Sequence, residues 1–175
     1  SSDAAPLSCA KSTSSAGSSG VCSTGLATLR RDGFASMDAI GTEGTLTTRP
    51  LEFTGKHLFV NADASQGEIR VEILSVFHTG GQLYAPDGGL TDPIRGFDAA
   101  NCVPIQTDST RAQVTWQSGK DLSVVAENLV QFRFHLKNAR LYSFWVTDDP
   151  SGASNGYLAV GGPGFSGPRD AVAPH

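Results

Sequence analysis

Side chains suited to binding chemistry alternate along residues 130–146, VQFRFHLKNARLYSFWV. Arg133, His135 and Lys137 lie two positions apart, so an extended strand points all three to one face while apolar residues point to the other. Guanidinium, imidazole and ammonium groups that share a face can hydrogen-bond hydroxyls and carboxylates. The spacing therefore predicts a strand with one buried side and one polar, ligand-binding side.

Neighbouring strands would widen this polar side. Residues 57–62 and 68–74 also read as strands. In one sheet with residues 130–137 they would add Asn61 and Arg70 to a cation-rich face of the kind that binds carbohydrate. The alternative is a solvated outer face in which Arg70, Glu72 and Arg133 form ion pairs of little energetic value.

A sugar site also needs a ring to stack on the C–H face of the sugar. Tyr142 or Trp145 could supply the ring, although the two point to opposite sides of one strand. The candidate ligand-binding residues are Asn61, Arg70, Arg133, His135, Tyr142 and Trp145.

The elements that must position these residues are short strands. Nine are predicted, at 26–30, 34–38, 44–48, 57–62, 68–74, 112–117, 130–137, 141–147 and 156–160. Residues 130–137 and 141–147 meet at Lys137–Arg140 and predict an antiparallel hairpin. Twenty glycines, nine prolines and 17% charged residues favour strands and turns over a helical bundle. We expect an all-β fold, an antiparallel two-sheet sandwich of jelly-roll type.

The chain of 175 residues and 18.3 kDa fits one domain. Residues 1–24 suit a Ser-rich N-terminal arm, 25–165 the β-sandwich, and 166–175 an irregular C-terminal tail. A net charge of -4 argues against nucleic-acid binding. No apolar run approaches the roughly 20 residues that span a bilayer, so we expect no membrane span.

Cys9, Cys22 and Cys102 cannot all pair within one chain. A disulfide between Cys9 and Cys22, which bracket a flexible Ser/Gly-rich segment, is the first choice, and Cys22–Cys102 is a close second. Either bond predicts a secreted protein, whereas three buried thiols are the alternative.

Catalysis has little support in the sequence. Arg70, His135 and Tyr142 are the residue types with which some sandwich-fold polysaccharide lyases abstract a proton beside a uronate carboxylate. The lyase pattern of Tyr, Lys and Gly at alternate positions is absent, as is a GxSxG elbow.

The sequence gives little support for a metal site. The four histidines are scattered, which gives zinc no support, and no cofactor is expected. Calcium is the one metal left open, with carboxylates at Asp32, Asp38, Asp148 and Asp149.

Several stretches resemble a β-sandwich module of large secreted bacterial proteins that are labelled glycoside hydrolase family 32-like. They are LRRDGFASMDA (29–39), GTLTTRPL (44–51), LFVNADA (58–64), GEIRVE (67–72), PIRGF (93–97), DST (108–110) and RFHLKNARLYSFW (133–145). In that family a similar sandwich follows a five-bladed propeller that carries the catalytic carboxylates. This chain has no room for a propeller and lacks the Asn-Asp-Pro-Asn type motif, so the family's activity does not carry over.

The resemblance implies an extracellular, non-catalytic module that binds carbohydrate or is accessory to a larger glycan-active protein. The chain departs from the family pattern at residues 76–91, which we interpret as an insertion. The alternative function is a structural or assembly subunit whose insertion and unpaired cysteine contact another protein chain. A polysaccharide lyase is the weaker alternative.

Overall fold

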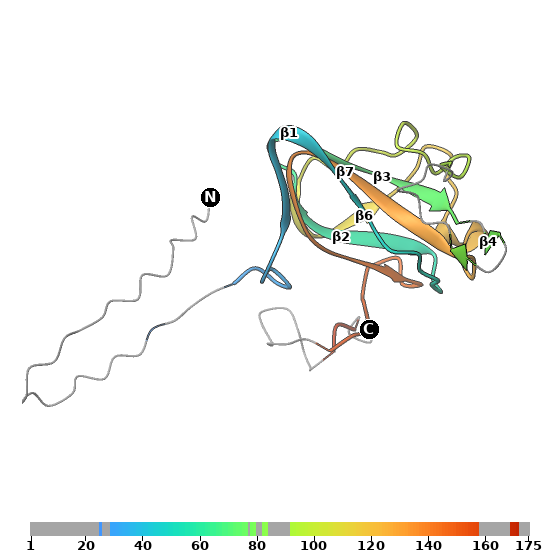
Figure 1. Ribbon diagram of the computed structural model, residues 1–175. Helices are drawn as coiled ribbons and strands as arrows, with labels where there is room; N and C mark the ends of the chain where they lie inside the picture. The colour runs from blue at the N-terminus through green and yellow to red at the C-terminus, as the bar shows by residue number, and fades with distance from the viewer. Residues whose placement is uncertain are drawn as a thin grey trace, which may run out of the picture.

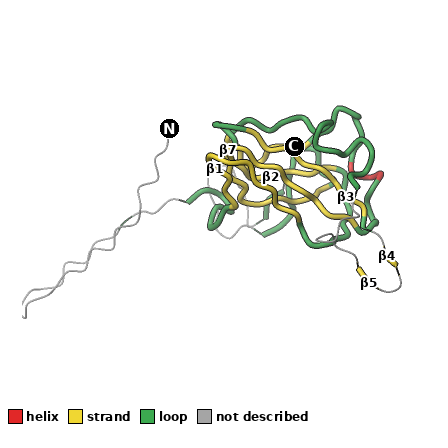
Figure 2. Tube along the Cα trace, turned by 45° about the horizontal axis from the view of Figure 1, so that its top comes forward, coloured by secondary structure: helices red, strands yellow, loops and turns green. Residues whose placement is uncertain are grey.

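The computed structural model describes residue 25 and residues 29–76, 78–79, 82–83, 92–157 and 169–171. The described residues form an all-β protein, with one antiparallel five-stranded sheet and a small two-stranded sheet (Figures 1 and 2). The strands are β1 (Met37–Thr47), β2 (His57–Asp63), β3 (Glu68–Ser75), β4 (His78–Thr79), β5 (Gln82–Leu83), β6 (Asp108–Val114) and β7 (Val130–Thr147), and one 3-10 turn spans Leu122–Val124. The predicted all-β class is confirmed.

Strand β7 organises the larger sheet. This strand has 18 residues, and residues 133–141 pair with β1 along one edge. On the other edge the first half of β7 pairs with β3 and the second half with β2, which in turn pairs with β6. In Figure 1, β1 and β7 both bend at the same end of the domain, so β2 and β3 lie on opposite sides of the fold.

The predicted hairpin at 137–140 is wrong, because β7 runs through this segment without a break. Asn138 has φ +43°, a left-handed conformation that asparagine tolerates, and this redirects the strand. Strand β1 loses its pairing between Ala39 and Glu43 at the same level, and the Gly41 N–H donates to Asn138 Oδ1 at 2.9 Å. Strands β1 and β7 therefore bend together, and residues 137–140 form a bend within β7 instead of a turn between two strands.

Some of the other predicted strands agree with the structure and some differ from it. Residues 57–62 and 68–74 correspond to β2 and β3 within one residue at each end. Predicted strands 34–38 and 44–48 overlap the two ends of the single strand β1, but residues 34–36 are not in a strand. Strand β6 begins earlier than predicted because its pairing with β2 extends to Asp63 and Asp108. The predicted strands 26–30 and 156–160 lie largely outside the described residues.

The hydrophobic core lies inside the bend of the sheet. Phe132 and Phe134 of β7 pack against Phe144 further along the same strand, with ring centroids 5.9 and 5.1 Å from it. Trp116 is buried, and its Nε1 donates to the Val71 carbonyl at 3.0 Å. One continuous core thus joins both halves of β7.

Cys102 is a free thiol in this core, which contradicts the Cys22–Cys102 disulfide. Its Sγ accepts the Val71 N–H at 3.2 Å, and burial raises the pKa of the thiol. A thiol enclosed in this way cannot reach another chain.

Several predictions fall on residues that the structure does not describe. They concern Cys9 and Cys22, the predicted arm 1–24, most of the insertion and most of the tail. Within the described ranges, no helix is long and apolar enough to cross a membrane.

Candidate functional site

Polar side chains form a grid on the outer face of the sheet where β1, the first half of β7 and β3 lie side by side. The registers align three rows across these strands. The rows, which together we call the polar face, are Glu43–Lys137–Glu68, Thr45–His135–Arg70 and Thr47–Arg133–Glu72. The prediction that Arg70, Arg133 and His135 share a face is therefore confirmed.

The polar face is not cation-rich, because carboxylates offset its cations. Lys137 Nζ lies 3.1 Å from Glu43 Oε1 at one end of the grid. Arg70 Nε lies 3.2 Å from Glu68 Oε1. The sequence pattern missed these two acids because they come from neighbouring strands, and pairing alone brings them opposite the cations.

Glu72 occupies the other end of the grid and is buried. Its Oε1 accepts from Arg133 Nη1 at 3.1 Å and also lies 3.0 Å from His135 Nε2, without the alignment of a hydrogen bond. Arg133 further donates to Thr47 Oγ1 at 3.2 Å. The ion pair expected under the alternative interpretation is thus present between Glu72 and Arg133, while Arg70 pairs with Glu68 instead.

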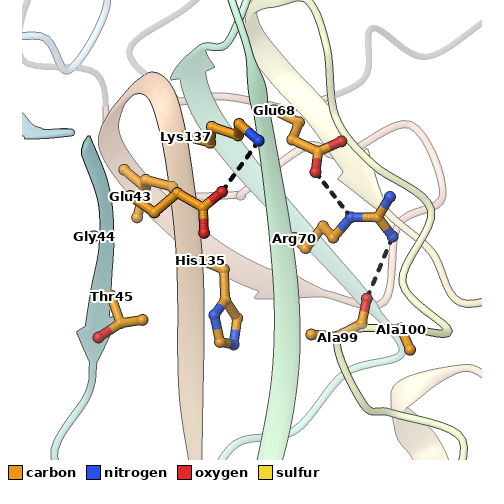
Figure 3. Close-up of a pocket in the computed structure, with 10 residues that line it drawn as sticks. Glu43, Gly44, Thr45, Glu68, Arg70, Ala99, Ala100, His135 and Lys137 are labelled. Carbon is orange, nitrogen blue, oxygen red and sulfur yellow. Dashed lines mark hydrogen bonds and ion pairs between the residues drawn. The ribbon is translucent and has the colours of Figure 1, made fainter. Parts of the chain in front are cut away.

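A shallow, open pocket of about 420 Å³ lies over this grid. Figure 3 shows His135 at the centre of the pocket, with the Lys137–Glu43 pair above it and Arg70 to its right. The backbone at Ala99 and Ala100 forms one wall. Arg70 Nη1 holds this wall in place by donating to the carbonyls of Cys102 at 2.9 Å and Ala99 at 3.4 Å.

Asn61 lies outside the pocket, contrary to prediction. It sits on β2 beside the second half of β7, where its partner is Ser143. Asn61 is buried, its Oδ1 accepts from Arg30 Nε at 2.6 Å, and its Nδ2 donates to the Arg31 carbonyl. Its amide thus holds the segment before β1 against the sheet instead of facing a ligand.

The two aromatic candidates also lie away from the pocket. The ring of Tyr142 lies under the Arg30 guanidinium, whose Cζ is 4.7 Å from the ring centroid. Trp145 stacks on Phe59 with centroids 5.8 Å apart and donates from Nε1 to the Gly152 carbonyl at 3.1 Å. Both rings are occupied by protein contacts, so the pocket lacks the predicted stacking platform.

A second polar cluster holds the ends of the described chain together. Asp170 is buried, and its Oδ2 accepts from Arg31 Nη2 at 2.7 Å and from the Ser154 N–H at 3.0 Å. Its Oδ1 accepts from Arg111 Nη2 at 2.8 Å. Burial alone would raise the pKa of Asp170, but these hydrogen bonds and the Arg31 charge outweigh it and lower the pKa. We call this cluster the Asp170 clasp; nothing in the local sequence pattern indicates it.

Three of the four carboxylates considered for calcium serve other contacts, and the fourth, Asp148, is exposed. Asp38 Oδ2 lies 3.4 Å from Arg140 Nε, and Asp149 Oδ1 accepts the Ser151 N–H at 2.8 Å in a turn. Asp32 Oδ2 lies 3.4 Å from Arg31 Nε. No group of three His, Cys, Asp or Glu side chains is placed to hold a metal within the described ranges.

Fold and pocket together define an all-β protein with a shallow polar pocket on one sheet face. No family model, curated protein or solved structure matches the chain. The chemistry of the polar face therefore has to indicate the function.

Proposed function

We propose that this protein is a non-catalytic, extracellular β-sandwich module of jelly-roll type that binds carbohydrate in the pocket over the polar face. The bends of β1 and β7 support the sandwich, because they bring β2 and β3 to opposite sides of one core (Figure 1). The resemblance to the glycoside hydrolase family 32-like module supports an accessory role beside a glycan-active domain.

The observation that carries the ligand class is the pairing of charges around the pocket. Lys137 with Glu43 and Arg70 with Glu68 place hydrogen-bond donors and acceptors side by side. A sugar hydroxyl both donates and accepts, so such mixed pairs match it. The paired charges cancel, which gives the pocket no excess of cations for a uronate or a sulfate. The proposed ligand is therefore a neutral glycan.

Affinity should be modest. Each net hydrogen bond to a ligand contributes only about 0.5–1.5 kcal/mol, and none of the described residues that line the pocket is aromatic and able to add stacking. At about 1 kcal/mol each, four or five such bonds correspond to a dissociation constant of roughly 0.2–1 mM. A module of this affinity would act by keeping a tethered partner domain close to a polymer with many repeated sites.

The lyase alternative loses its third residue in this geometry. Arg70 and His135 line the pocket, but Tyr142 lies under Arg30 and is not among the lining residues. A proton abstraction that needs all three at one carbon has no support here. Binding without turnover is the function that the described residues support best.

A glycan array with neutral, uronic and sulfated polymers tests the proposal. We expect binding to neutral glycans, weakened about two- to twelvefold in each of His135→Ala and Lys137→Ala, which is the loss of one hydrogen bond. Arg140→Ala is the matched control, because Arg140 also forms an exposed ion pair on β7 but does not line this pocket. Arg70→Ala is a poorer probe, since it would also free the Ala99 wall.

Two results would overturn the proposal. One is the absence of binding to any glycan by the folded wild-type protein. The other is glycan binding that His135→Ala and Lys137→Ala leave unchanged, which would move the site elsewhere. Binding restricted to uronic or sulfated polymers would refute the neutral ligand class.

A further inference from the structure

Apolar side chains are exposed along the segment that leads into β1. Seven large apolar residues are exposed in the described part of the chain, and four of them lie within residues 29–40. Phe34 is 79% exposed, Met37 55% and Ile40 64%. Isolated exposed apolar residues are ordinary, but a run of them along one short segment is typical of an interaction surface.

The same segment reaches the edge of the larger sheet. Within the described residues β1 pairs with β7 alone, so its other edge carries no strand (Figure 1). An edge strand presents alternate N–H and C=O groups to any chain that can pair with it. Natural edges are commonly protected by lysine or proline, and residues 33–41, GFASMDAIG, contain neither.

Charge indicates which partner fits this edge. Asp38 is the one charged residue of 33–41; Arg140 Nε offsets its charge at 3.4 Å, and the Ser36 hydroxyl donates to its Oδ1 at 2.6 Å. Two copies of this edge can therefore meet without bringing unpaired like charges together. A strongly charged partner would find no complementary charge, whereas a second copy offers the same apolar side chains and the same free edge.

We propose that the edge of β1 at residues 37–40, with the exposed Phe34 just before it, forms a self-association edge through which two copies of this chain pair antiparallel about a two-fold axis. The bulge between Ala39 and Glu43 ends the regular edge, which limits the pairing to a short stretch and favours a discrete dimer over open-ended assembly. The polar face begins beyond this bulge at Glu43, so this proposal does not depend on carbohydrate binding.

Sedimentation equilibrium of the full chain tests the proposal over a range of concentrations. An edge of this length buries little surface, so we expect a reversible dimer with a dissociation constant on the order of 10–100 μM. Ile40→Lys and Met37→Lys should each raise that constant at least tenfold, because each adds an ammonium group to both copies and replaces an apolar side chain of the edge. Val124→Lys is the matched control, since Val124 is 59% exposed but lies away from β1.

Amide hydrogen exchange supplies a second readout. Amides of residues 34–40 should exchange more slowly at high than at low protein concentration, while those of β6 should not change. A wild-type protein that stays monomeric throughout would overturn the proposal. A dimer that Ile40→Lys and Met37→Lys leave intact would also overturn it, because another surface would then hold the copies. Circular dichroism establishes that each variant is folded.

Discussion

Replacing Asp170 by Asn should destabilise the protein markedly although the shape of the side chain hardly changes. The buried carboxylate accepts from Arg31 at 2.7 Å and from Arg111 at 2.8 Å, and their side chains are 19% and 31% exposed. Removing one partner of a fully buried ion pair costs about 3–5 kcal/mol. Because both arginines keep contact with water, we expect a smaller loss of about 2–3 kcal/mol in the free energy of unfolding.

Urea unfolding at pH 7 measures this loss directly. A loss of that size corresponds to a fall of about 4–12 °C in the melting temperature of a domain of this length. Asp148→Asn is the control, because Asp148 is exposed and makes the same chemical change outside the clasp. An Asp170→Asn protein within about 0.5 kcal/mol of wild type would refute the reasoning, because surface substitutions lie in that range.

The pH dependence supplies the second test of the clasp. The hydrogen bonds and the Arg31 charge hold the pKa of Asp170 below its ordinary value of 3.8 in the folded protein. The unfolded chain therefore binds this proton at higher pH than the folded chain does, and the stabilisation is complete above the ordinary pKa. It is lost as the pH falls through the folded-state pKa. The stability difference between wild type and Asp170→Asn should be constant from pH 5 to 8 and shrink below about pH 4.

Two further predictions concern the packing of the core. In Gly67→Ala the new Cβ would lie 1.8 Å from the Lys137 carbonyl oxygen, so the β2–β3 turn would have to separate from β7. Urea unfolding should show a loss of about 3 kcal/mol or more. Gly25→Ala should show none, because no atom of the described residues lies within 4 Å of its new Cβ, and equal midpoints for the two variants would contradict the contact. Cys102 should not react with a thiol reagent in the native protein, because it is buried and its pKa is raised. Native thiol counts of wild type and Cys102→Ser should agree, and the reduced, unfolded counts should differ by one; a higher native count in wild type would show that the thiol is accessible.

The candidate site shows how far strand periodicity reaches. Alternation along 130–137 correctly places Arg133, His135 and Lys137 on one side of a strand, because successive side chains of any strand point to opposite faces. The same reasoning cannot locate Glu43 or Glu68. Those two residues face Lys137 only because β1 and β3 pair with β7 in one particular register.

The sequence by itself determined the all-β class, two of the strands within a residue, and which side chains share a face within a strand. Each of these follows from local backbone geometry, composition and turn residues. Tertiary structure decided that β7 continues through Asn138, and that β3 and β2 pair with different halves of it.

Tertiary structure also decided that the alternation of side chains between the two faces of β7 is interrupted at Tyr142. Asn61 pairs with Ser143 and Ala62 with Leu141, so Tyr142 is an extra residue between two paired positions. Local alternation carries no information about such an insertion. Register is selected by how all the apolar faces fill one core at once, and a shift by one residue moves every side chain that follows to the other face. For that reason Arg70, His135 and Lys137 meet in one pocket, while Asn61, Tyr142 and Trp145 hold other parts of the chain in place.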